Sequence, residues 1–127
     1  MEPYYPFHIV SEEDMPLIYV YTLSHRYAQF RPIFNDYGYQ TSGLVWSAHI
    51  IQILEERAPS LLFNTMFCPN KPSVYVYFDT YQALNQFQRV LAPIFQDFNL
   101  LESFIQKAKT DRIGEQINQF LNTGYFY

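Results

Sequence analysis

Alternating apolar and polar positions in two parts of the chain predict two β-hairpins. The runs Tyr5–Val10 and Leu17–Tyr21 flank a polar turn, and the runs Leu61–Phe67 and Ser73–Phe78 flank the proline-containing turn Cys68–Pro72. Runs rich in β-branched and aromatic residues, bounded by turn residues, are typical of paired antiparallel strands. We therefore expect about four strands in two hairpins.

Apolar residues at helical spacing follow the first hairpin. Ser24 is a suitable N-cap for a helix over about 25–36, in which Pro32 predicts a kink or a fresh helix start. Ser42 caps a clearer helix over about 43–57. Two helices are therefore expected between the hairpins.

A second pair of helices follows the second hairpin and defines the fold class. A long helix is predicted to open at Asp79 and Thr80, and Asn99 with Glu102 resembles the capping box of another helix. Because strands and helices do not alternate singly, a parallel doubly wound sheet is disfavoured. We expect one α+β domain, residues 1–127, with an antiparallel sheet of about four strands and helices packed on one face.

Two pairs of similar segments favour an internal duplication. Pro16–Tyr21 and Pro72–Tyr77 share Pro, Tyr, Val and Tyr at corresponding positions 56 residues apart, and Pro32–Tyr37 resembles Pro93–Phe98. A duplicated unit would give a pseudo-symmetric sheet, although chance matches are easier in a tyrosine-rich chain. The hypothesis divides the chain into halves 5–57 and 61–109 and a C-terminal tail, 110–127.

Aromatic residues outnumber charged ones, at 20% against 16%, and 12 of them are tyrosines. Alternate residues of a strand face opposite sides, so the tyrosines of the second and fourth strands share the face opposite the aliphatic side chains. They are Tyr19, Tyr21, Tyr75 and Tyr77. Tyrosine is enriched at binding hot spots, so this face is a candidate partner-binding surface. The alternatives are that the tail covers it or that the rings only stabilise cross-strand pairs.

The other large aromatic side chains predict where the core lies. Phenylalanine can be buried without a hydrogen-bond partner, whereas a buried phenol needs one. The residues expected in a core between helices and sheet are Phe63, Phe67, Phe78, Phe87, Phe95, Phe104 and Trp46.

The charge pattern bounds the kind of partner. The net charge is −4, and the eight Lys and Arg residues are scattered. Because affinity for nucleic acid rests on neutralising phosphates, a nucleic-acid partner is disfavoured. An acidic chain suits a basic partner. Glu12, Glu13 and Asp14, at the tip of the first hairpin, are candidate contacts for it, although solvation alone also explains them.

Residue types that carry catalysis or bind metals are sparse. His8, His25 and His49 lack metal-binding spacing, and His49 is expected on the polar or flanking side of its helix. Cys68 is the only cysteine, which excludes an intramolecular disulfide and a cysteine-based zinc site. A leader segment and a run of about 18 apolar residues are also absent. We expect a cytoplasmic, non-enzymatic protein without cofactor, metal or membrane partner.

One segment carries a resemblance to a known family. Residues 38–46 read Gly-Tyr-Gln-Thr-Ser-Gly-Leu-Val-Trp, and a predicted helix follows that ends near Glu-Glu-Arg-Ala-Pro at 55–59. This pattern resembles the immunity protein 51 family of bacterial polymorphic toxin systems, on Gly38, Gly43 and Trp46. The resemblance covers roughly residues 7–108, and it departs from the family pattern at Leu44, Pro32 and Pro93.

The resemblance implies a non-enzymatic antidote that binds a cognate toxin and blocks its active site or substrate access. It implies a structural role for the motif, in which Gly43 allows a tight entry into the helix and Trp46 anchors it. The alternative is another protein–protein interaction or regulatory domain. A tyrosine-rich face also fits a homodimer surface.

Overall fold

One antiparallel sheet organises the chain. The computed structural model describes residues 3–10 and 15–126, so the acidic turn at Glu12, Glu13 and Asp14 lies outside the described residues. Within these ranges four strands pair in the order β1-β2-β4-β3. They are β1 (Ile9–Val10), β2 (Leu17–Tyr21), β3 (Thr65–Phe67) and β4 (Ser73–Phe78). The predicted α+β class with an antiparallel sheet is confirmed.

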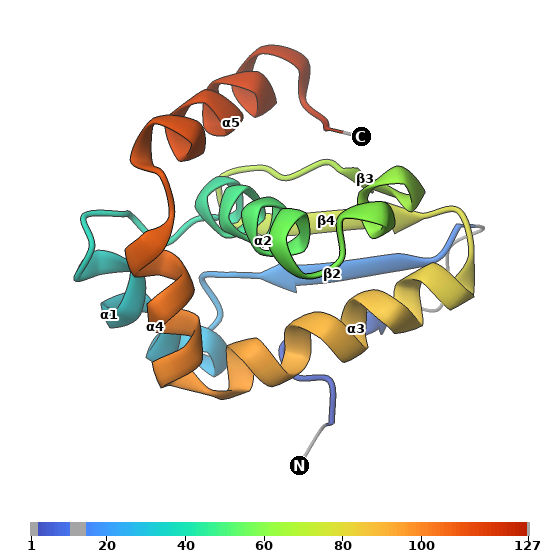
Figure 1. Ribbon diagram of the computed structural model, residues 1–127, viewed down its shortest axis with the longest axis horizontal. Helices are drawn as coiled ribbons and strands as arrows, with labels where there is room; N and C mark the ends of the chain where they lie inside the picture. The colour runs from blue at the N-terminus through green and yellow to red at the C-terminus, as the bar shows by residue number, and fades with distance from the viewer. Residues whose placement is uncertain (1–2, 11–14, 127) are drawn as a thin grey trace.

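Helices cover the face of the sheet that carries its aliphatic side chains (Figure 1). Helices α2 and α3 both contact β4, and α5 packs on α2. The segments are η1 (His25–Phe30), α1 (Arg31–Asn35), α2 (Gly43–Arg57), η2 (Pro59–Asn64), α3 (Tyr81–Gln96), α4 (Phe98–Lys107) and α5 (Thr110–Thr123), where η marks 3₁₀ helix. Among the residues that the structure describes, no helix is long and apolar enough to cross a bilayer.

Two of the predicted strands are shorter than expected. The first begins only at Ile9, because Pro6 belongs to a preceding turn and has no N–H to give to a strand ladder. The third is reduced to Thr65–Phe67, because Pro59–Asn64 forms η2. The fixed φ of Pro59 favours a helical start, and a short apolar run does not by itself distinguish strand from helix.

The stretch 25–36 is helical, but it is not one continuous helix. Its first half is the 3₁₀ segment η1, and α1 starts afresh at Arg31, directly before Pro32. The backbone of η1 is itself interrupted at Tyr27, whose φ of −113° and ψ of 15° are not helical, and its buried residues are Tyr27 and Phe30. The predicted fresh start near Pro32 is therefore confirmed.

Side-chain caps fix the starts of α2, α3 and α4. Ser42 and Thr80 each accept a hydrogen bond from the N–H three residues later, both at 3.1 Å, as expected of N-caps. Helix α4 is capped by Asp97, whose carboxylate accepts from the Leu100 N–H at 3.2 Å. The predicted capping box at Asn99 is therefore wrong, because the N-cap lies two residues earlier, at Asp97.

The C-terminal segment turns back onto an edge of the sheet. Gly124 ends α5 with φ +85°, a conformation that favours glycine. The chain then reaches β3, where the Phe67 N–H donates to the Phe126 carbonyl at 2.8 Å and the Phe126 N–H donates back at 2.9 Å. The described part of the tail therefore covers the β3 edge and packs on α2, and it leaves the tyrosine side of the sheet uncovered.

Aromatic rings fill the core between the helices and the sheet. Trp46 is fully buried, with ring centroids 5.1 Å from Phe30 and 5.3 Å from Phe95. The expected core residues are buried with one exception, because Phe63 is 90% exposed. The run 61–67 is predicted to be a strand, whereas Phe63 lies in η2, where Leu61 is the inward residue.

Candidate functional site

The tyrosine face, formed by Tyr19, Tyr21, Tyr75 and Tyr77, lies on the side of the sheet away from α2 and α3. The aliphatic residues that alternate with these tyrosines in β2 and β4 are fully buried. Tyr21 is 43% exposed and the other three are partly exposed. Strand alternation therefore predicted the direction of these side chains correctly.

Ring packing limits how far the central tyrosines are exposed. Tyr19 lies directly opposite Tyr75 in the β2–β4 register, and their ring centroids are 4.8 Å apart at a tilt of 45°. Ser73 Oγ lies 3.4 Å from the Tyr19 hydroxyl. Partial burial and the neighbouring phenols of Tyr19 and Tyr77 raise the pKa of Tyr75 above its ordinary value. The Tyr75 phenol therefore stays protonated at neutral pH, where it can donate and accept a hydrogen bond.

A groove of about 550 Å³ opens at the Tyr21 end of this face. Its apolar walls are Tyr21, Leu23, Leu44, Val45, Pro72 and Ile117. The space is sufficient for an apolar side chain of a partner. Sequence reasoning missed the groove, because its walls come from segments that only the folded chain brings together.

The residues that carry the family resemblance lie in the scaffold. Gly38 has φ +85° after α1, and Trp46 is fully buried in α2. Gly43 is the first residue of α2, and its N–H donates to the Lys71 carbonyl in the β3–β4 turn at 2.7 Å. None of the three belongs to the tyrosine face.

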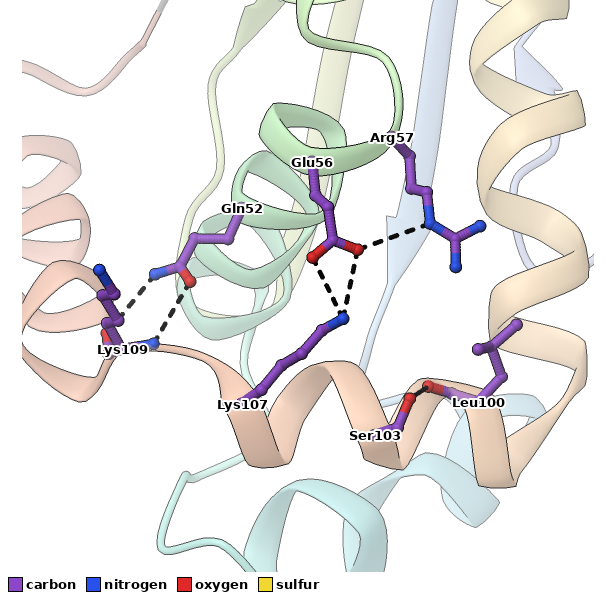
Figure 2. Close-up of polar contacts among 7 residues, drawn as sticks. All are labelled: Gln52, Glu56, Arg57, Leu100, Ser103, Lys107 and Lys109. Atoms are coloured by element: carbon purple, nitrogen blue, oxygen red, sulfur yellow. Dashed lines mark hydrogen bonds and ion pairs between the residues drawn. The ribbon is translucent and has the colours of Figure 1, made fainter.

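Ion pairs join α2 to the last two helices beside a second cleft, of about 310 Å³. Glu55 accepts from Arg112 Nη2 at 2.7 Å, and Glu56 lies 3.1 Å from Lys107 Nζ. Figure 2 shows that Glu56 also faces Arg57, at 3.5 Å. The carboxylates are thus engaged in cross-links between helices, and each pair is exposed enough to be weak individually.

His49 lines this cleft from α2 but is only 2% exposed, so its predicted polar or flanking position is wrong. Its Nδ1 lies 2.9 Å from the Val45 carbonyl, and the rings of Phe34 and Tyr39 pack edge-on against it. Burial lowers the pKa of His49 to about 4. The side chain is therefore neutral, with the proton on Nδ1, which donates to Val45. Within the described ranges, no three His, Cys, Asp or Glu residues are grouped to hold a metal ion.

Comparison with known proteins adds no relative. No protein-family model, no curated protein and no solved structure matches the chain. The resemblance of residues 38–46 to the immunity protein 51 family therefore stays a prediction, and the tyrosine face is the surface on which a function can be argued.

Proposed function

We propose that this chain is an immunity protein that binds a cognate protein toxin through the tyrosine face and blocks the toxin's active site or its access to substrate. One observation carries the proposal: four tyrosines point from a sheet face that the described helices leave uncovered. The resemblance of residues 38–46 to an immunity protein family supports it.

The tyrosine face has the physical properties of a binding hot spot. Tyrosine offers a large apolar contact area together with a polar hydroxyl, and little conformational freedom is lost when it is held. Tyr19 and Tyr75 already pack against each other on a rigid sheet, so a partner would not need to order them. The groove beside Tyr21 adds a site for an apolar side chain from the toxin.

The test is protection of cells from the toxin encoded by the neighbouring gene, followed by binding calorimetry with a catalytically inactive form of that toxin. Wild type should protect cells and bind the toxin. The double variant Tyr75→Ser, Tyr77→Ser should weaken binding by at least about 100-fold, because truncation of central aromatic anchors removes much of the binding free energy.

Leu121→Ser is the matched control, since Leu121 is 61% exposed on α5 and belongs neither to the tyrosine face nor to the lining of the groove beside Tyr21. The control should bind like wild type. Cell death despite abundant, folded wild-type protein would exclude this toxin as the target and contradict the proposal. Unchanged affinity of the double variant would show that the tyrosine face is not the binding surface.

A further inference from the structure

Three chain segments meet at the end of the sheet where β4 runs into α3 (Figure 1). The Phe78 N–H donates to the Pro16 carbonyl at 2.9 Å, which fixes the start of β2. The Asp79 N–H points to the Asn64 carbonyl at 3.3 Å, which ties in the end of η2. Pro16 reaches the end of β4 from the β2 side and Asn64 reaches it from the β3 side, so residues 15–16 and 63–64 flank residues 78–81.

Each of the three segments exposes one large apolar side chain. Phe63 is 90% exposed, Tyr81 is 51% exposed and Met15 is 45% exposed. Single exposed apolar residues are common on protein surfaces, whereas several at one place indicate an interaction site. Together with the exposed Asp79, we call these residues the Phe63 end.

The backbone presents Phe63 in a fixed position. Leu61 and Thr65, two residues to either side, are both buried, and the Thr65 hydroxyl donates to the Leu62 carbonyl at 3.2 Å. A partner would therefore meet an aromatic side chain whose backbone is already ordered, which reduces the entropy cost of binding.

The charge around the Phe63 end is negative. Residues 58–70 and 72–88 contain no Lys or Arg, and Asp79, two residues before Tyr81, is exposed. No Lys or Arg occurs from residue 15 to residue 23. A basic surface complements such a patch. In a two-fold dimer through the same surface, Asp79 would approach its own copy, which disfavours a second copy of this chain as the occupant.

We infer that the Phe63 end is a second contact site for the toxin, and that it inserts Phe63 into an apolar pocket rimmed by basic side chains. This inference rests on the proposed function. The tyrosine face alone offers limited contact area, because three of its four tyrosines are partly buried. A stable interface needs about 800 Å² from each partner, and a second site would supply part of that area. Tyr77 lies next to Phe78 at this end, so the tyrosine face reaches towards the Phe63 end.

The experiment uses the full chain and the inactive toxin from the neighbouring gene. Phe63→Ala should weaken binding by about 10- to 100-fold, without loss of stability, because the ring is exposed in the free protein. Leu121→Ala, the same kind of truncation at an exposed position on α5, should have no effect on binding. Asp79→Asn should slow association at low salt and make the association rate less dependent on ionic strength.

The outcomes separate this inference from the proposed function. If wild type binds the toxin and Phe63→Ala binds equally tightly, the second contact site is excluded and the proposed function stands. If wild type does not bind, both fail. An unchanged salt dependence in Asp79→Asn would contradict a basic partner surface. Sedimentation that shows a wild-type dimer dissociated by Phe63→Ala would identify a second copy of the chain as the occupant, and would overturn the inference.

Discussion

At the scale of single residues, Gly43 shows how a missing side chain positions a helix. A Cβ atom at this residue would lie 2.0 Å from the Ser73 carbonyl oxygen and 2.4 Å from the Asn70 carbonyl oxygen, both in the backbone of the β3–β4 hairpin. Real atoms do not approach so closely, and a backbone carbonyl cannot swing away as a side chain can. Space, rather than unusual backbone conformation, is therefore what requires glycine here.

Gly43→Ala should destabilise the protein by about 3 kcal/mol, because the added methyl group forces the α2 start away from the hairpin. Gly114→Ala, in the exposed middle of α5, is the matched control. A Cβ there meets nothing within 4 Å, so alanine should stabilise the protein by about 0.5–1 kcal/mol through its better helix propensity. Urea denaturation of both variants measures the two opposite changes. Equal effects would contradict the packing argument.

His49 makes stability depend on pH. Its pKa falls from an ordinary 6.5 to about 4 because burial disfavours the charged ring, although the Val45 carbonyl opposes this. Between these two values the unfolded chain binds the proton and the folded chain does not. Stability should therefore fall as the pH is lowered from about 6.5 to 4, by about 3 kcal/mol in total, and this contribution should be constant above pH 6.5.

Urea denaturation across this pH range, compared between wild type and His49→Met, isolates the contribution. The variant should lose stability less steeply on acidification, because it has no buried base to protonate. His25→Gln removes one exposed histidine and controls for the change in histidine number. If wild type and His49→Met have parallel pH profiles, His49 does not titrate as its burial requires.

At the scale of secondary-structure elements, the C-terminal segment protects an edge strand. Two backbone hydrogen bonds pair Phe126 with Phe67 of β3. An exposed strand edge is a template for unwanted pairing with other chains. The turn at Gly124 thus directs residues 125–126 back to the sheet, where they cover the β3 edge.

Deletion of residues 124–127 should expose the β3 edge. The Phe67 amide loses its acceptor, so its hydrogen exchange should accelerate by at least about 10-fold. The neighbouring Cys68 amide donates to the Tyr75 carbonyl at 2.9 Å and should keep its protection. Global stability should fall by about 1–2 kcal/mol, from two lost hydrogen bonds and lost contact with Phe126. Unchanged exchange at Phe67 would show that the pairing is not formed in solution.

Sequence patterns predicted elements better than they predicted boundaries. Hairpins, the N-cap at Ser42, the helix that opens at Asp79 and Thr80, and the direction of the strand tyrosines follow from local rules that hold in any context. The identity of η2 as helix, the exposure of Phe63 and the burial of His49 depend on which segments pack together. No local spacing carries that information, so these features emerged only with the tertiary structure.

At the scale of the whole molecule, the sheet is symmetric in its connections. The two hairpins pair with each other through their second strands, β2 and β4. Tyr19 and Tyr75 occupy corresponding positions 56 residues apart, and they are direct partners at the centre of the β2–β4 ladder. The helices break this symmetry, because five-residue α1 follows the first hairpin and sixteen-residue α3 follows the second. Duplication of the two halves therefore stays a prediction, and the sheet is the part of the molecule to which it applies.

The buried position of Trp46 has a practical consequence for every variant described above. It is the only tryptophan in the chain, and its ring is enclosed by Phe30, Phe34 and Phe95 on the opposite side of the sheet from the tyrosine face. Indole emission shifts to longer wavelength when water reaches the ring. Unfolding should therefore shift the maximum of tryptophan emission to longer wavelength, whereas binding of a partner to the tyrosine face should leave it unchanged. Fluorescence of an unlabelled variant thus distinguishes loss of the fold from loss of a binding contact.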